Sequence, residues 1–169
     1  KCQAVYQLLG VPAPTTPPVA TAAEECDRRT DARAYYYTYV NQWGEESAPS
    51  PASNIVVVRD GVSVQVSGIA LPPEGYGIIA ANLYRAATGF RQDDVKTQKP
   101  LTDFLYVTTI EFPTTSFTDT VKMIGLGPVC ETQKVRMPPK GVQNIVAIGG
   151  VNRLAGTVKN RVHLSEQHQ

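Results

Sequence analysis

One run of side chains constrains the fold of this chain more than any other feature. Residues 35–40 read Tyr-Tyr-Tyr-Thr-Tyr-Val, and aromatic and β-branched residues of this kind favour a strand. Successive side chains of a strand point to opposite faces. The tyrosines at 35, 37 and 39 therefore share one face, while Tyr36, Thr38 and Val40 share the other. We expect one of the two faces to pack into a core, because a buried tyrosine contributes a large apolar area.

Further short runs predict more strands after this one. Gly- and Pro-containing connections separate them, and we find no amphipathic helix with caps. The predicted strands are Ile55–Arg59, Val62–Val66, Ile78–Ala86, Phe104–Ile110 and Ser116–Asp119. Asp60 and Gly61 stand between the first two, and a two-residue Asp-Gly loop predicts a β-hairpin. Short strands at this spacing predict an all-β fold with a β-sandwich over residues 35–127.

The two ends of the chain differ from this middle region. Residues 1–34 are predicted to form an extended leader, because the segment Val11–Pro18 is rich in proline and favours polyproline II. Residues 128–169 are predicted to form a small antiparallel meander that resembles one blade of a β-propeller. Its strands are Val142–Ile148, Val151–Ala155 and Arg161–Leu164, with tight turns at Gly149-Gly150 and Lys159-Asn160. A three-stranded meander is marginal alone and needs a partner surface.

Composition argues against several classes of function. The chain has 16 basic and 15 acidic residues, so it lacks the basic surplus that a nucleic-acid or anionic-membrane binder needs. No apolar run is long enough to span a bilayer. Three widely spaced cysteines indicate neither a disulfide framework nor a metal knuckle. The first residue is Lys1 rather than Met, from which we expect a piece of a longer protein.

The sequence also lacks the patterns that carry catalysis or cofactor binding. His163, His168 and Glu166 could be written as a metal cluster, but we interpret the histidines as one at a strand end and one in the tail. A zinc site needs three or four converging ligands, and the cysteines are too scattered to contribute. Neither a nucleophile elbow nor a phosphate loop occurs. Asp93 and Asp94 form a pair of carboxylates in a polar loop, which does not give the two environments that acid–base catalysis needs. We therefore expect no enzyme activity, no cofactor and no metal.

Contact surfaces are the remaining candidates for function. The outer face of the tyrosine strand is open to three interpretations: core packing, contact between proteins, or stacking against a sugar. The polar segment Thr88–Pro100 is predicted to be a long surface loop. The candidate contact residues are Tyr36, Trp43, Arg91, Asp93 and Asp94.

Part of the chain resembles a fibronectin type III domain. Residues 35–50, with Tyr-Thr-Tyr-Val-Asn and then Gly-Glu-Glu-Ser and Pro-Ser, resemble its sixth strand and the following turn. Residues 82–89, which contain a Tyr-Arg pair, resemble its third strand, and residues 104–107 and 115–120 resemble the strands after it. The resemblance implies that Tyr35, Tyr37 and Tyr39 face the core. Because the sixth-strand motif precedes the third, it implies either a permuted sandwich or a different neighbour for residues 35–58.

The order of these motifs resembles large virion proteins of tailed bacteriophages. In those proteins a Tyr-Thr-Tyr-Val-Asn segment is followed by a Tyr-Arg strand, a Thr-Asp-Thr turn and a Pro-Pro…Gly…Ser-Glu stretch, here residues 137–166. The resemblance covers residues 35–166, and the final stretch tends to open a longer, propeller-like β region. It implies a non-enzymatic tail component, such as a nozzle or tube-end protein, located in the virion. Its partners would be copies of itself in a ring and neighbouring virion proteins.

Two other functions remain open. A tail fibre or a bacterial surface protein would use the same sandwich as a spacer or as a module that binds a receptor or glycan. A wall-degrading hydrolase is a third hypothesis, but the sequence shows no paired carboxylates in a plausible cleft.

Overall fold

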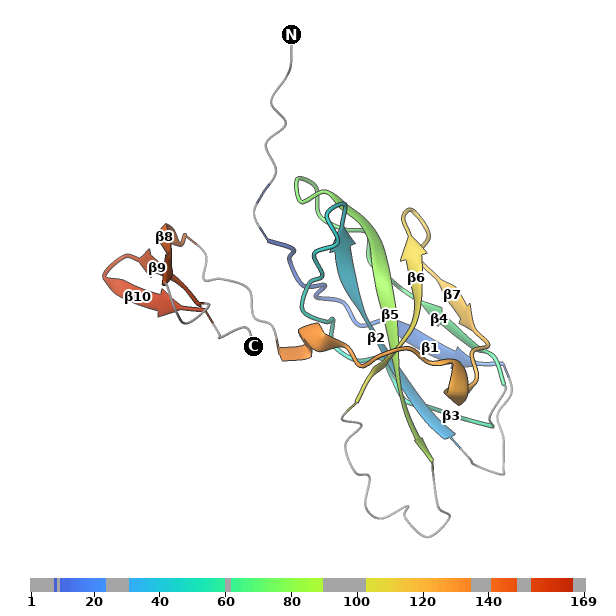
Figure 1. Cartoon of the computed structure of the whole chain (residues 1–169). Helices are drawn as coiled ribbons and strands as arrows, with labels where there is room; N and C mark the ends of the chain where they lie inside the picture. The colour runs from blue at the N-terminus through green and yellow to red at the C-terminus, as the bar shows by residue number, and fades with distance from the viewer. Residues whose placement is uncertain are drawn as a thin grey trace. The chain divides into compact units, whose positions relative to one another are not determined.

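The strands of this chain gather in two units. The computed structural model describes residues 8, 10–23, 31–59, 62–89, 103–134, 141–148 and 153–165. Unit 1 is Lys1–Val135 and unit 2 is Arg136–Gln169. Every sheet in the described residues is antiparallel, and helical structure there is limited to two short 3₁₀ turns, Met123–Gly125 and Glu131–Lys134 (Figure 1). The predicted all-β fold class is confirmed.

Unit 1 contains two sheets. The smaller has the order β1-β4-β7, with β1 at Val19–Ala22, β4 at Val64–Ser67 and β7 at Phe117–Asp119. The larger has the order β3-β2-β5-β6, with β3 at Val56–Val58, β2 at Asp31–Asn41, β5 at Ile78–Gly89 and β6 at Leu105–Glu111. The longest ladder joins β2 to β5, which lie side by side in Figure 1. Its register places Tyr36 opposite Tyr84.

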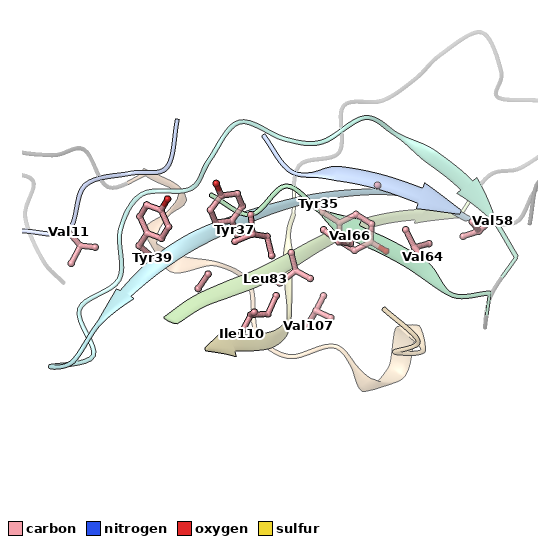
Figure 2. Packing of buried hydrophobic residues seen from close by; sticks show 13 residues of the cluster. Val11, Tyr35, Tyr37, Tyr39, Val58, Val64, Val66, Leu83, Val107 and Ile110 are labelled. Atoms are coloured by element: carbon pink, nitrogen blue, oxygen red, sulfur yellow. The ribbon is translucent and has the colours of Figure 1, made fainter. Parts of the chain in front are cut away.

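Side chains from both sheets meet in one core. The larger sheet contributes Tyr35, Tyr37, Tyr39, Val58, Ala81, Leu83, Val107 and Ile110. The smaller sheet contributes Ala20, Val64 and Val66, with Val11 and Ile69 from the flanking chain. Figure 2 shows the labelled members of this cluster gathered between the ribbons. The prediction that the odd-numbered tyrosines face the core is confirmed, because all three are buried there.

Part of the opposite face of the larger sheet is buried as well. Its side chains form a second cluster, which consists of Ala34, Tyr36, Tyr84, Ala86, Phe104 and Cys130. Cys130 comes from a segment that returns along β6, where Tyr106 N–H donates to the Pro128 carbonyl at 2.9 Å and Gly127 N–H donates to the Tyr106 carbonyl at 2.8 Å. Gly127 suits this close passage, because a Cβ there would lie 2.9 Å from Cδ1 of Tyr106. The returning segment therefore covers part of the face that sequence alone left open.

A ladder of serines occupies the edge of β2 beyond the short strand β3. Proline has no N–H and cannot donate to a regular ladder, yet this segment contains Pro49 and Pro51. Serines spaced three residues apart bond instead to alternate tyrosines, each through both its N–H and its hydroxyl oxygen. The pairs are Ser47 with Tyr39, Ser50 with Tyr37 and Ser53 with Tyr35, at 2.7–3.2 Å. Each hydroxyl also donates to the next residue's carbonyl.

Two charged pairs lie among the described residues of unit 1. Arg85 is fully buried and its Nη1 donates to Asp119 Oδ2 at 2.6 Å and to the Val121 carbonyl at 2.7 Å. Arg33 Nε donates to Asp31 Oδ2 at 2.8 Å, and Arg33 Nη1 donates to the Val62 carbonyl at 3.1 Å. Each arginine thus has a buried carboxylate partner, which is the condition under which buried charge is tolerated.

The predicted hairpin at Asp60-Gly61 is wrong. The two strands that it would join belong to different sheets, because β3 pairs with β2, whereas β4 pairs with β1 and β7. Val58 and Val64 both lie in the core between the sheets. The chain here crosses from one sheet to the other, since burying apolar side chains of both strands outweighs the local turn preference.

The bounds of the parts also differ from those expected. Residues 1–34 were expected to be a leader, but β1 lies within them and pairs with β4, and β2 already begins at Asp31. The sandwich was expected to end at residue 127, whereas unit 1 extends to Val135. The physical reason is that Ala20 and Cys130 both bury side chains in the clusters of unit 1.

Unit 2 is the predicted meander. Its order is β10-β9-β8, with β8 at Gln143–Ile148, β9 at Arg153–Val158 and β10 at Arg161–Leu164. The turn at Lys159-Asn160 is present, and Lys159 has a φ of +53°. Gly149 and Gly150 lie outside the described residues. Gly156 is the buried residue of β9, and a Cβ there would lie 2.6 Å from Cγ1 of Val142. A side chain at this position would therefore require Val142 to shift.

Candidate interaction surfaces

Tyr36 does not lie on an exposed contact surface. Its side chain is 3% exposed, and its ring lies 4.1 Å from that of Phe104 and 5.5 Å from that of Tyr84, measured between centroids. Burial raises the pKa of its phenol, and the neighbouring Cys130 thiol raises it further. The expected contact role of Tyr36 is therefore corrected to core packing, the first of the three interpretations that the sequence left open.

Of the other four candidate residues, one is exposed and three lie outside the described residues. Trp43 is 60% exposed, in the turn after β2. Arg91, Asp93 and Asp94 lie outside the described residues, together with most of the predicted loop from Thr88 to Pro100. Of the five, Trp43 is the one that the structure places on the surface.

The turn that carries Trp43 is held by one side chain. Asn41 is buried, and its Oδ1 accepts hydrogen bonds from the N–H groups of Trp43, at 3.0 Å, and Glu45, at 2.9 Å. Its Nδ2 donates to Glu45 Oε2 at 2.7 Å. Gly44 has a φ of +80°, a conformation that glycine adopts without a Cβ penalty. Asn41 therefore presents the indole on a fixed backbone.

The end of unit 1 that carries Trp43 exposes further apolar side chains, and we call it the Trp43 end. Here β2 ends beside the start of β5, since Asn41 pairs with Ile78 and Gln42 N–H donates to the Gly77 carbonyl. Its exposed apolar side chains are Leu8, Trp43, Leu71 and Ile79. Its exposed acidic side chains are Glu45, Glu74 and Glu111.

Backbone and side-chain contacts tie these residues to that end. Leu8 N–H donates to the Gly75 carbonyl at 2.8 Å, and the Tyr39 hydroxyl donates to the Leu71 carbonyl at 3.3 Å. Glu111 pairs with Ala80 at the end of β6. Of the residues at the Trp43 end, only Trp43 was selected from the sequence. One sequence feature could have indicated the others: Leu71 is a single large apolar residue in a Pro- and Gly-rich loop that also contains Glu74.

Unit 2 exposes apolar side chains on both faces of its sheet. Residues paired across an antiparallel ladder share a face. Val146, Ala155 and Leu164 form one such row, and Val162 lies opposite Thr157 in the next row. Val146, Val162 and Leu164 are 57%, 70% and 57% exposed, respectively. We call this side, with Ile148 and Arg153, the meander face. Leu154, on the other side, is exposed as well.

The two units carry opposite charge. Residues 136–169 hold five basic residues and one acidic residue, so their net charge is +4. Residues 1–135 hold the remaining 11 basic and 14 acidic residues, for a net charge of −3. Arg33 and Arg85 are buried beside carboxylates. In unit 1, Arg59 and Lys122 are the basic residues described as exposed, against Glu45, Glu74, Asp103, Glu111 and Glu131.

Burial raises the pKa of several tyrosines of unit 1. Burial raises the pKa of the Tyr35 phenol, and the adjacent Asp119 carboxylate raises it further. Burial likewise raises the pKa of Tyr84, whose hydroxyl donates to Glu46 Oε1 at 2.6 Å. Such tyrosines hold their protons at neutral pH, so they serve as hydrogen-bond donors.

A search of the described ranges finds no group of three His, Cys, Asp or Glu side chains placed to hold a metal ion. Within the same ranges, no helix is long and apolar enough to cross a membrane. No family model, curated protein or solved structure matches this chain.

Proposed function

We propose that this chain is a structural component of a bacteriophage tail, a candidate nozzle or tube-end protein that works through contacts between copies. The proposal starts from the order of sequence motifs that resembles tailed-phage virion proteins. The observation that carries it is the meander of unit 2, whose three strands leave apolar side chains exposed on both faces. Such a sheet needs a covering surface, as a building block of an assembly does.

The strand order of unit 1 supports the fibronectin-like part of the proposal. In sandwiches of the immunoglobulin type, the third, sixth and seventh strands share one sheet, with the sixth in the middle. β5 carries the motif resembling a third strand and β2 the motif resembling a sixth, and they are neighbours, with β3 on the far side of β2. This order fits a permuted sandwich, in which the sixth-strand segment precedes the third along the chain.

The proposed role is mechanical and needs no catalytic residue, metal or cofactor. Copies of the chain would bind one another and neighbouring virion proteins, and a repeated contact between identical subunits closes into a ring when its rotation allows. Location in the virion belongs to the same proposal.

The test is to locate the protein on intact particles. An antibody raised against residues 35–127 would be detected by gold label in electron micrographs of phage. Label confined to the tail is expected, and its position at the tube end or on a fibre separates a nozzle from a receptor binder. Label on bacterial surfaces, with none on particles, would overturn the proposal.

A second candidate function is a receptor- or glycan-binding adhesion module. The exposed indole of Trp43 on its Asn41-held turn favours it, because an exposed aromatic ring is a platform for the apolar face of a sugar. The full chain would then bind envelope glycans of the host, and Trp43→Ala would abolish the binding. Absence of binding at high micromolar protein would exclude this function.

A further inference from the structure

We propose that the meander face of one copy docks on the Trp43 end of a second copy of this chain. The inference rests on the proposed function in one respect, which is that copies of the chain assemble. The inference adds which two surfaces meet and why each surface would bind the other rather than its own copy.

The charges of the two surfaces favour contact between unit 2 of one copy and the Trp43 end of another. The described residues of unit 2 include Arg153, Lys159 and Arg161 and no acidic residue. The connections that build the Trp43 end carry three exposed glutamates, and the described segments there, residues 41–47 and 68–77, contain no Lys or Arg. Opposite charge favours contact between these surfaces, and like charges brought together are unfavourable.

The same charges disfavour the two symmetric alternatives. Two meanders placed face to face would bring their basic residues together. Two Trp43 ends would oppose Glu45, Glu74 and Glu111 to their own copies. A contact between different surfaces of identical chains is heterologous, and such contacts build rings or filaments rather than two-fold dimers.

Both surfaces offer apolar area for the centre of an interface. Val146, Val162 and Leu164 lie exposed on the meander face, and Trp43 and Ile79 lie exposed on the other. Interfaces concentrate aromatic and apolar residues at the centre and charges at the rim. The glutamates of the Trp43 end, together with Arg153 on the meander face and Lys159 in the β9–β10 turn, would be these rim charges.

The test exchanges the charges in the full chain. One variant carries Arg153→Glu with Lys159→Glu, and the other carries Glu74→Lys with Glu111→Lys; Arg153 is partly exposed and the other three side chains are exposed. Sedimentation velocity across a concentration series, at low and high salt, measures assembly. Each variant alone is expected to assemble at least about tenfold more weakly than the wild type. An equimolar mixture of the two should assemble again, because each reversed surface then meets a complementary one.

A matched control reverses the two exposed basic residues of unit 1 that lie away from the Trp43 end, Arg59→Glu with Lys122→Glu. Assembly of this control should equal that of the wild type, and far-ultraviolet circular dichroism verifies that all variants fold. If the wild type assembles but both reversed variants assemble equally well, the docking is wrong while the proposed function stands.

A wild-type chain that stays monomeric at millimolar concentration would overturn the docking and argue against self-assembly. Cross-links between the two units that form only within single chains, in a mixture of isotope-labelled and unlabelled protein, would also overturn it. Gold label on the tail remains an independent readout of the proposed function.

Discussion

The Tyr35 hydroxyl donates a 2.8 Å hydrogen bond to Asp119 Oδ2, and so links β2 in the larger sheet to β7 in the smaller one. The same carboxylate oxygen accepts from Arg85 Nη1, and Oδ1 accepts from the N–H of Val121 at 2.9 Å. Asp119 thus joins a buried arginine, a core tyrosine and the backbone after β7. This relationship connects the two sheets by polar contacts inside an otherwise apolar core.

We predict that Tyr35→Phe lowers the free energy of unfolding by about 1.5–3 kcal/mol, because a hydrogen bond to a buried charged group is lost while the ring stays. Urea denaturation of the full chain measures the change in midpoint. The control is Tyr106→Phe, since the Tyr106 hydroxyl bonds to Thr109 Oγ1 at an exposed site. Equal effects of the two substitutions would contradict a special role for the Asp119 contact.

The serine ladder makes a separate prediction. Ser50→Ala removes the acceptor of the Tyr37 N–H, which is bonded at 3.2 Å in a buried setting, and a buried unpaired N–H is costly. We expect a loss of about 1–3 kcal/mol in unfolding free energy. Ser116→Ala is the same substitution at an exposed position of unit 1 and should change stability by less than about 0.5 kcal/mol. A Ser50→Ala variant as stable as the Ser116→Ala variant would show that water replaces the serine.

The tyrosine strand shows how far the sequence could predict this fold. Period-two alternation and the fibronectin resemblance together predicted that Tyr35, Tyr37 and Tyr39 face the core. They could not predict that Tyr36 is buried too. Phe104 and Cys130, which lie far from it in the sequence, pack over Tyr36. No local sequence pattern predicts a contact between residues so far apart.

The predictions that proved wrong, the Asp60-Gly61 hairpin and the leader over residues 1–34, failed for the same reason. The Asp-Gly signal describes a local turn, but the pairing of β4 with β1 and β7 is decided by a core shared between sheets. β1 is only four residues long and lies just after a proline-rich run, so its pattern was too short to stand out. Within the candidate surfaces, Trp43 was recognisable from its type, whereas Ile79 joins it only because β2 and β5 are neighbours.

Alkaline pH should destabilise unit 1. Burial raises the pKa of Tyr35, Tyr36, Tyr39 and Tyr84 above the value of 10.0 that an unfolded tyrosine has. Above about pH 10 the unfolded chain loses these protons while the folded chain retains them, so ionisation favours unfolding. The stability that these groups contribute is fully present below pH 10 and decreases as pH rises through the folded pKa values.

The decrease in unfolding free energy per pH unit has an upper limit. Each such tyrosine contributes up to about 1.4 kcal/mol of lost stability per pH unit. Tyrosinate absorbance should therefore rise in two stages, first for accessible tyrosines and then for the buried ones together with loss of the β-sheet circular dichroism signal. Ionisation of all eight tyrosines in one stage, with the fold intact, would contradict the burial of this set.

The single tryptophan of the chain reports on the Trp43 end directly. Because Trp43 is 60% exposed in the isolated chain, its emission at low concentration should be that of a solvated indole. If copies bind one another through this surface, the emission should shift to shorter wavelength with rising concentration and return on dilution or in high salt, which screens rim charges. The Arg153→Glu, Lys159→Glu variant keeps Trp43 but should show no such shift. A shift of the same size in that variant would mean that Trp43 is covered by something other than the basic meander.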